Sequence, residues 1–164
     1  MEDTDLLVAN SSARGLAVLW SYNERKFPNW LASCVTACRK QGFIWWDVGW
    51  KTNFHQISPP VDGFIWNTVE KLVTHKSRIE NIIRQPDRKK IDEIAKNWRT
   101  LNLPTHKNCP FVLIGQKGIA GTLTVLKLTN LEPLERPKSL DAFILRNGKH
   151  PSVGPQARYY VFAN

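Results

Sequence analysis

The feature that most constrains the fold is the order in which strand-like and helix-like patterns follow one another along the chain. Short apolar runs rich in β-branched and aromatic residues predict strands at 14–20, 43–50, 62–66, 70–83, 110–115, 121–128 and 158–162. Helical spacing predicts helices at 29–41 and 86–98 and a short helix at 140–145. The strands and helices do not alternate, and no repeat is visible. This order favours an α+β fold, with a curved mixed β-sheet or small β-barrel and two or three flanking helices, over a doubly wound parallel sheet.

The predicted helix boundaries rest on residues with known preferences for helix ends. Pro28 suits the first turn of the helix at 29–41, and Gly42 suits the stop at its C-terminus. Ser139 is expected to cap the short third helix. The run 70–83 fits a helix almost as well as a strand, and a strand is preferred.

Length and charge point to one domain with an anionic partner. The chain has 164 residues, and a single domain is expected over residues 1–164. Its 23 lysines and arginines exceed its 14 aspartates and glutamates, which gives a net charge of +9. Such an excess attracts nucleic acid or an anionic membrane surface. No basic amphipathic helix with one apolar face is apparent, so nucleic acid is the leading partner, and a basic but inert surface is the alternative.

Cysteine usage and the N-terminus indicate the compartment. Three cysteines are few and odd in number for a secreted disulfide scaffold. The acidic N-terminus, MEDTD, lacks the basic and apolar regions of a signal peptide. No apolar run approaches the roughly 18 residues that a membrane-spanning helix needs. A cytoplasmic protein without a membrane partner is therefore expected.

Sequence patterns for catalysis and for bound cofactors are weak or missing. GxxxxGK[ST], GxGxxG and GxSxG do not occur, and none of the four histidines stands in a pattern that marks a general base. The segment GQKGIAG at 115–121 could cradle a phosphate, but a hairpin connection is favoured. Cys34, Cys38, His106 and Cys109 could form a zinc site, but buried free cysteines are favoured. No catalytic residue, metal or cofactor is therefore predicted, and a binding module is favoured over an enzyme.

Four of the seven tryptophans crowd into the stretch from Trp45 to Trp66. Alternation along the strand predicts that Trp46 and Trp45 point to opposite faces. Indole walls with one polar side chain could hold a flipped base, because base–aromatic stacking contributes about 1–3 kcal/mol. The same tryptophans could instead belong to the core. The predicted base-binding residues are Trp45, Trp46, Asp47, Trp50, Asn53 and Trp66. The predicted phosphate-binding residues are Lys51, Lys76, Arg78, Arg84, Arg88, Lys89 and Lys90.

Three segments follow one another as an aromatic strand, a basic strand, and a hairpin that leads to an NG turn. They are GFIWWDVGWKTN at 42–53, VDGFIWNTVEKLVTHKSRIENII at 61–83, and FVLIGQKGIAGTLTVLKLTNLEPLERPKSLDAFILRNGK at 111–149. In this order they resemble the PUA-like superfamily, and more narrowly its EVE/YTH-like branch, which includes reader domains of modification-dependent restriction systems. The resemblance implies a curved β-barrel that holds a flipped, modified base in an aromatic cage, with Trp45, Trp46 or Trp50 as walls and Trp66 as a further wall.

The N-terminal forty residues depart from that branch, and their strand lacks the lysine–serine pair of the YTH kind. The base preference therefore stays open. The resulting hypothesis is a nucleic-acid-binding reader of a methylated base, with DNA favoured over RNA and an effector nuclease or NTPase domain as a further partner. The alternatives are an RNA-binding or nucleic-acid-processing enzyme of the same superfamily, and a protein–protein adaptor.

Overall fold

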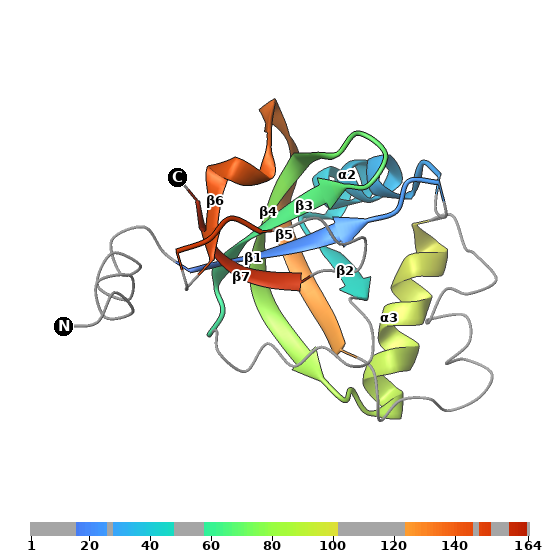
Figure 1. Ribbon diagram of the computed structural model, residues 1–164. Helices are drawn as coiled ribbons and strands as arrows, with labels where there is room; N and C mark the ends of the chain where they lie inside the picture. Colours follow the sequence, from blue (N-terminus) through green and yellow to red (C-terminus); the bar gives the residue numbers. More distant parts are fainter. Residues whose placement is uncertain are drawn as a thin grey trace. The chain divides into compact units, whose positions relative to one another are not determined.

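The structure is a computed structural model that describes residues 16–25, 28–47, 58–101, 124–145, 148–151 and 158–163, with only the backbone described at 47 and 158–163. Figure 1 labels the helices and strands along the chain. They are β1 (Ala17–Tyr22), α2 (Trp30–Gln41), β2 (Ile44–Asp47), β3 (Val61–Asn67), β4 (Leu72–Arg84), α3 (Arg88–Thr100), β5 (Thr124–Lys138), the 3-10 helix η2 (Leu140–Ala142), β6 (Phe143–Leu145) and β7 (Arg158–Ala163).

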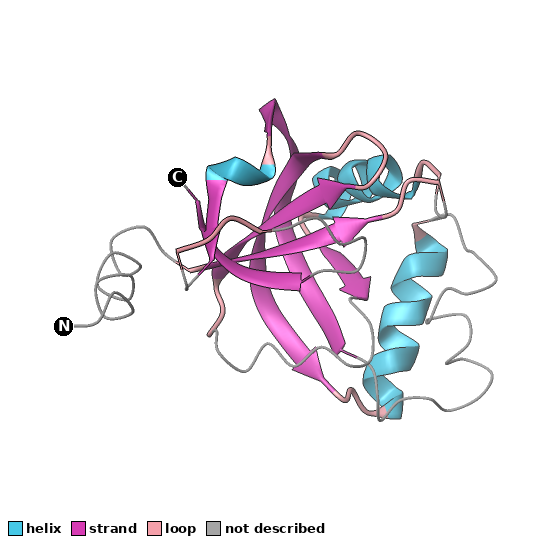
Figure 2. Ribbon diagram, in the orientation of Figure 1, coloured by secondary structure: helices cyan, strands magenta, loops and turns pink. Residues whose placement is uncertain are grey.

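The strands form a mixed sheet. Their hydrogen-bonded order is β2-β5-β4-β3-β1-β7-β6. β1 runs parallel to β3 and antiparallel to β7, while β2–β5 and β6–β7 are antiparallel pairs. Figure 2 shows strands and helices in one fold without regular alternation. The predicted α+β class, with a mixed sheet and helices beside it, is confirmed.

The chain divides into two compact units, each assembled from separate stretches of sequence. The first unit comprises Met1–Pro28, Val61–Arg78 and Glu132–Asn164, and the second comprises Asn29–Pro60 and Ile79–Leu131. β4 and β5 are long strands, of 13 and 15 residues, and each contributes residues to both units.

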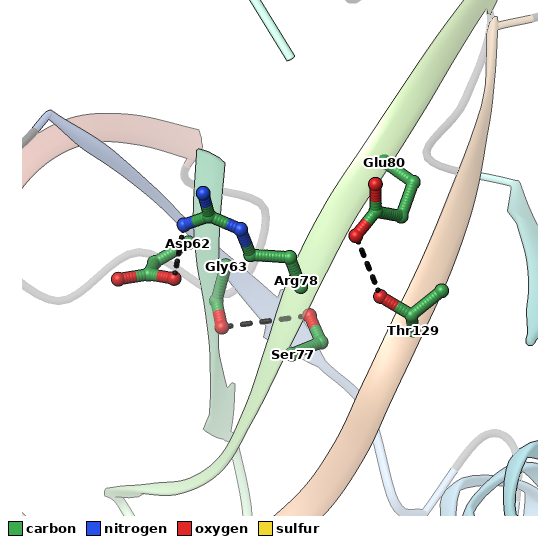
Figure 3. A network of polar contacts seen from close by, with 6 residues as sticks. All are labelled: Asp62, Gly63, Ser77, Arg78, Glu80 and Thr129. Carbon is green, nitrogen blue, oxygen red and sulfur yellow. Dashed lines mark hydrogen bonds and ion pairs between the residues drawn. The ribbon is translucent and has the colours of Figure 1, made fainter. Parts of the chain in front are cut away.

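The core of the first unit is built from β1, β3, β4 and β6. Apolar side chains at alternating positions gather into one buried cluster: Ala17, Leu19, Phe64, Trp66, Val73 and Phe143. The opposite side of β1 carries Trp20, which is 2% exposed and lies against Gly63 of β3. A Cβ atom at position 63 would lie 2.7 Å from a carbon of the Trp20 ring, so only glycine fits there without a shift. Ser77 Oγ donates a hydrogen bond of 3.5 Å to the carbonyl oxygen of Gly63 (Figure 3).

The core of the second unit is a cluster of three tryptophans from α2, β2 and α3. The ring centroid of Trp30 lies 4.3 Å from that of Trp46 and 5.7 Å from that of Trp98. Trp98 Nε1 donates a hydrogen bond of 3.1 Å to the carbonyl oxygen of Trp45. Gln41 at the end of α2 exchanges amide hydrogen bonds of 3.0 and 3.2 Å with Asn97. These contacts join both helices to the short strand β2.

Most predicted elements are present. Strands occur at the positions expected around 14–20, 62–66, 70–83 and 158–162, and helices occur at 30–41 and 88–100. The helical alternative for 70–83 is excluded, because β4 covers 72–84. Gly42 caps α2 in the left-handed conformation, at φ 91°. The predicted strand at 110–115 lies outside the described residues, as do positions 48–50 of the strand predicted at 43–50.

Three local predictions were wrong: the helix at 140–145, its cap at Ser139, and the place of Pro28 in the first turn of α2. Residues 140–145 form one 3-10 turn followed by β6, and the Ser139 side chain makes no capping hydrogen bond. The strand predicted at 121–128 is confirmed over its described residues, 124–128, and β5 continues beyond them to Lys138 despite two prolines. Among the described residues, β2 pairs only with residues 125–128 of β5. Pro133 and Pro137 lie in the part of β5 that β2 does not pair with, where the missing N–H of a proline costs no hydrogen bond to β2. Pro28 lies in the turn before α2 and outside its first helical turn.

None of the helices in the described ranges has both the length and the apolar character required to cross a membrane.

Candidate functional site

The connection between β4 and α3, in the second unit, places several cations side by side. β4 ends at Arg84, and Gln85 turns the chain in the left-handed conformation, at φ 48°. Pro86 follows, and Asp87 forms the N-cap of α3, where its carboxylate accepts a hydrogen bond of 2.8 Å from the backbone nitrogen of Lys90. The tight turn brings the end of the strand close to the first turn of the helix.

A basic hollow of about 440 Å³ lies at this connection. Its lining comprises Ile83, Arg84, Gln85, Pro86, Asp87, Lys89, Lys90 and Glu93. Its two acids already have partners, because Asp87 caps the helix and Glu93 lies 3.2 Å from Lys90 Nζ. Arg84 and Lys89 are exposed, and no described residue forms an ion pair with Lys89. The hollow therefore offers cationic groups to the solvent.

The first turn of α3 carries a charge pattern that opposes helix stability. Arg88, Lys89 and Lys90 occupy this turn, which contains no acidic residue. The helix dipole makes the N-terminal end positive, so cations there are unfavourable and anions favourable. Arg88 relieves part of this repulsion through an ion pair of 3.2 Å with Asp92. A bound anion would relieve the rest, because the first turn of a helix also presents backbone N–H groups.

A second surface borders the basic hollow, which we call the lysine-covered aromatic face. It comprises Phe43, Trp45, Lys90 and Lys127. Phe43 and Trp45 stand two residues apart along β2, with ring centroids 5.8 Å apart in an edge-on arrangement. Lys90 Nζ lies 4.9 Å from the Trp45 ring centroid, and Lys127 Nζ lies 4.9 Å from that of Phe43. Lys90 belongs to both the hollow and this face.

Three of the predicted base-binding residues, Trp45, Trp46 and Trp66, are buried. Trp45 and Trp46 point to opposite faces of β2, as alternation predicts, and they are 5% and 4% exposed. Trp66 is buried in the core of the first unit. Asp47 is the last residue of β2, and Trp50 and Asn53 lie outside the described residues.

Four of the seven predicted phosphate-binding residues lie around the start of α3. Arg84, Lys89 and Lys90 line the basic hollow, and Arg88 shares the first turn of α3 with the two lysines. Arg78 and Lys76 belong to the first unit, and Arg78 forms an ion pair of 2.9 Å with Asp62. Lys51 lies outside the described residues.

Figure 3 shows the polar contacts that β4 makes with its neighbouring strands. Arg78 reaches Asp62 of β3, while Glu80 accepts a hydrogen bond of 3.0 Å from Thr129 Oγ1 of β5. Both contacts are exposed, so each contributes little to stability. The Arg78 guanidinium already has a carboxylate partner, so it would have to give up this ion pair to reach a phosphate.

None of the residues that line the basic hollow is a cysteine or a histidine. Cys34 and Cys38 are buried in α2 and neither forms a disulfide among the described residues, while the other two candidate zinc ligands, His106 and Cys109, lie outside the described residues. Across the described ranges, no three His, Cys, Asp or Glu side chains come together as a metal site would require. Burial lowers the pKa of His75 below its ordinary value, while the charges of Glu24 and Glu132 act in the opposite direction. His75 Nδ1 lies 2.8 Å from Thr74 Oγ1.

The sequence analysis missed two residues of the lysine-covered aromatic face, Phe43 and Lys127. Phe43 precedes Trp45 by two positions, which is the spacing of one strand face. Lys127 stands between two buried leucines, Leu126 and Leu128, and pairs directly with Trp45 across the β2–β5 ladder. A lysine between two leucines was the available signal, but its partner strand could not be read from the sequence.

Comparisons with known proteins give three similar solved structures. The crystal structure of ASCH from Zymomonas mobilis has 13% sequence identity and a TM-score of 0.45, and the match covers 76% of this chain and 74% of that one. A tyrosine-to-phenylalanine mutant of the Zymomonas mobilis protein gives 15% identity and a TM-score of 0.44, with 76% of each chain covered. The N-terminal domain of Staphylothermus marinus McrB gives 8% identity and a TM-score of 0.35, with 76% and 77% covered. No protein-family model and no curated protein matches the sequence.

Proposed function

We propose that this protein binds nucleic acid and that the basic hollow of the second unit contacts the phosphate backbone. The observation that carries the proposal is the meeting of Arg84, Lys89 and Lys90 around one open hollow at the start of α3. Arginine and lysine side chains together with a helix N-terminus are the groups that hold phosphates in protein–nucleic acid complexes.

The distribution of charge supports the same surface. The second unit contains 12 lysines and arginines against 5 aspartates and glutamates, a net charge of +7. The first unit contains 11 against 9, a net charge of +2. A polyanion is therefore drawn mainly to the second unit, because long-range attraction follows the local excess of charge.

We further propose that the bound nucleic acid is DNA with a modified, methylated base, as the resemblance to the EVE/YTH-like branch implies. The base would be read near the end of β2, by Asp47, Trp50 and Asn53 with Trp45 beside them. Trp46 and Trp66 are core residues of their units, so contact with a base would require these rings to leave the core. In this proposal the protein specifies the target, and an effector nuclease or NTPase domain acts on it.

The test is fluorescence anisotropy with matched oligonucleotides: DNA and RNA, single- and double-stranded, with and without a methylated base, at two salt concentrations. Salt-dependent binding supports the nucleic-acid function, since each phosphate contact releases counterions. Tighter binding of one methylated species supports the reader. Absence of salt-dependent binding to every species contradicts the proposal.

Two matched variants test whether the basic hollow makes the phosphate contact. Lys89→Ala should weaken binding to all oligonucleotides alike and reduce the salt slope by about 0.7 to 0.9. Lys96→Ala removes the same charge from an exposed position of the same helix that does not line the hollow, and it should bind like the unmodified protein. Equal losses in the two variants would assign the attraction to net charge and not to the hollow.

A further inference from the structure

We propose that the lysine-covered aromatic face takes up an unpaired nucleobase, so that the protein's ligand is a single-stranded or locally unpaired nucleic acid. This inference rests on the proposed function, because the phosphate next to that base is held in the basic hollow. The face consists of Phe43, Trp45, Lys90 and Lys127, all within the second unit.

Two lysine side chains lie over the aromatic rings of this face. Trp45 is 5% exposed and Phe43 is half-buried. Two ammonium groups lie over these rings: Lys90 Nζ is 4.9 Å from the Trp45 centroid, and Lys127 Nζ is 4.9 Å from the Phe43 centroid and 5.8 Å from the Trp45 centroid. Contacts of this kind are weak at exposed sites, and the lysine stem is flexible. A stronger partner for the ammonium groups therefore uncovers the rings.

A nucleotide supplies a phosphate that can bind the lysine ammonium group and a base that can take the place of that group over the aromatic ring. Its phosphate attracts the ammonium group of a lysine more strongly than an aromatic ring does, because the phosphate carries a full negative charge. Lys90 lines the basic hollow while it lies over Trp45, so it can turn from the ring to a phosphate bound in the hollow. Its present ion pair with Glu93 is exposed and holds it only weakly. The base of the same nucleotide can then stack where the ammonium group was.

The aromatic rings of this face favour an unpaired base over a duplex. Bases in a duplex already stack on their neighbours and present only their edges, whereas an unpaired base offers its face. Stacking on Phe43 and Trp45 is tolerant of sequence because every base has such a face.

The experiment compares two single-stranded DNA oligonucleotides with the same number of phosphates, one made of thymidines and one made of abasic residues. We expect the thymidine strand to bind the full-length protein more tightly by roughly 5- to 150-fold per stacked base. Phe43→Leu removes one of the two rings, so it should reduce the affinity for the thymidine strand and leave the abasic affinity unchanged. Phe43→Tyr keeps the ring and should keep the preference.

The outcomes separate this inference from the function on which it rests. Equal, salt-dependent affinity for both strands would overturn the base site and leave phosphate binding in place. Failure of both strands to bind would overturn the proposed function as well. A preference that Phe43→Leu does not reduce would overturn the assignment of the base site to this face, and an unchanged abasic affinity in that variant would show that the protein is folded.

Discussion

The two units bury tryptophan in similar ways and differ in what they present to the solvent. The first unit places Trp20 and Trp66 among apolar strands, and the second stacks Trp30, Trp46 and Trp98 between two helices and a strand. Their net charges are +2 and +7. Abundant tryptophan is therefore a property of both cores, while the concentrated positive charge distinguishes the second unit, on which the proposed binding surface lies.

In the second unit, one helix contributes both to the core and to the basic hollow. α3 supplies Trp98 to the core on one side and Lys89 and Lys90 to the basic hollow on the other. The first unit has no such overlap among its described residues, since its buried cluster lies on strands outside the hollow. Damage to the core should therefore weaken binding when it is made in the second unit and leave binding intact when it is made in the first.

The largest expected effect is that of Trp98→Ala. The substitution empties a site that is 3% exposed and removes the hydrogen bond to the Trp45 carbonyl, so we expect a loss of about 3–5 kcal/mol in the free energy of unfolding. Urea denaturation measures this loss, and oligonucleotide affinity should fall with it because α3 is no longer anchored. Trp98→Phe keeps most of the ring and should lose less. A change below about 1 kcal/mol for Trp98→Ala would contradict the assigned packing.

Gly63→Ala should have the next largest effect. The new methyl group would meet the buried Trp20 ring at 2.7 Å, and overpacking of this kind destabilises by about 1–3 kcal/mol. The urea midpoint should fall, while the affinity of the remaining folded protein for oligonucleotides should not change. Gly63→Ala combined with Ser77→Ala serves as the control, because it removes the Ser77 Oγ contact at 3.0 Å and leaves the Trp20 contact. Full recovery of the urea midpoint in the double variant would show that the new methyl group clashes with Ser77 and not with Trp20.

These residues also show which parts of the fold could be predicted. The face of α3 that carries Ile91, Ile94, Ala95 and Trp98 followed from helical spacing, and all four are buried as predicted. The contact between Trp20 and Gly63 could not be predicted in this way, because it depends on the parallel pairing of β1 with β3, which joins positions far apart in the chain. Local periodicity specifies helices and strands, but pairing between distant strands is set by the packing of the whole chain.

The same distinction applies to the site. Arg84, Arg88, Lys89 and Lys90 are close in sequence, and one turn brings them together, so their charge pattern was visible in the sequence. The lysine-covered aromatic face combines β2, α3 and β5, and only the β2–β5 register places Lys127 opposite Trp45. A longer helix was expected at 140–145 because Ser139 suits an N-cap, but its side chain makes no capping hydrogen bond and β6 begins at Phe143.

The smallest expected effect is a pH dependence confined to the first unit. Burial lowers the pKa of His75 in the folded protein below 6.5, so the unfolded chain binds the proton more readily. The contribution of neutral His75 to stability is present above pH 6.5 and is lost as the pH falls through the pKa of the folded state. The urea midpoint should therefore decrease in this acidic range, and His75→Gln should decrease less. If the urea midpoint rises on acidification, and His75→Gln removes that rise, the lowered pKa assigned to His75 would be contradicted.

The most direct test of the binding surface is the salt dependence of oligonucleotide affinity in two matched double variants. Arg84→Ala with Lys89→Ala removes two cations from the basic hollow of the second unit, and Arg136→Ala with Lys138→Ala removes the same residue types from β5 in the first unit. We predict that the first pair lowers the slope of log affinity against log salt by about 1.4 to 1.8, two phosphate contacts, and that the second pair leaves it nearly unchanged. Equal changes in the two pairs, or no change in the first, would contradict the assignment of nucleic-acid binding to the basic hollow.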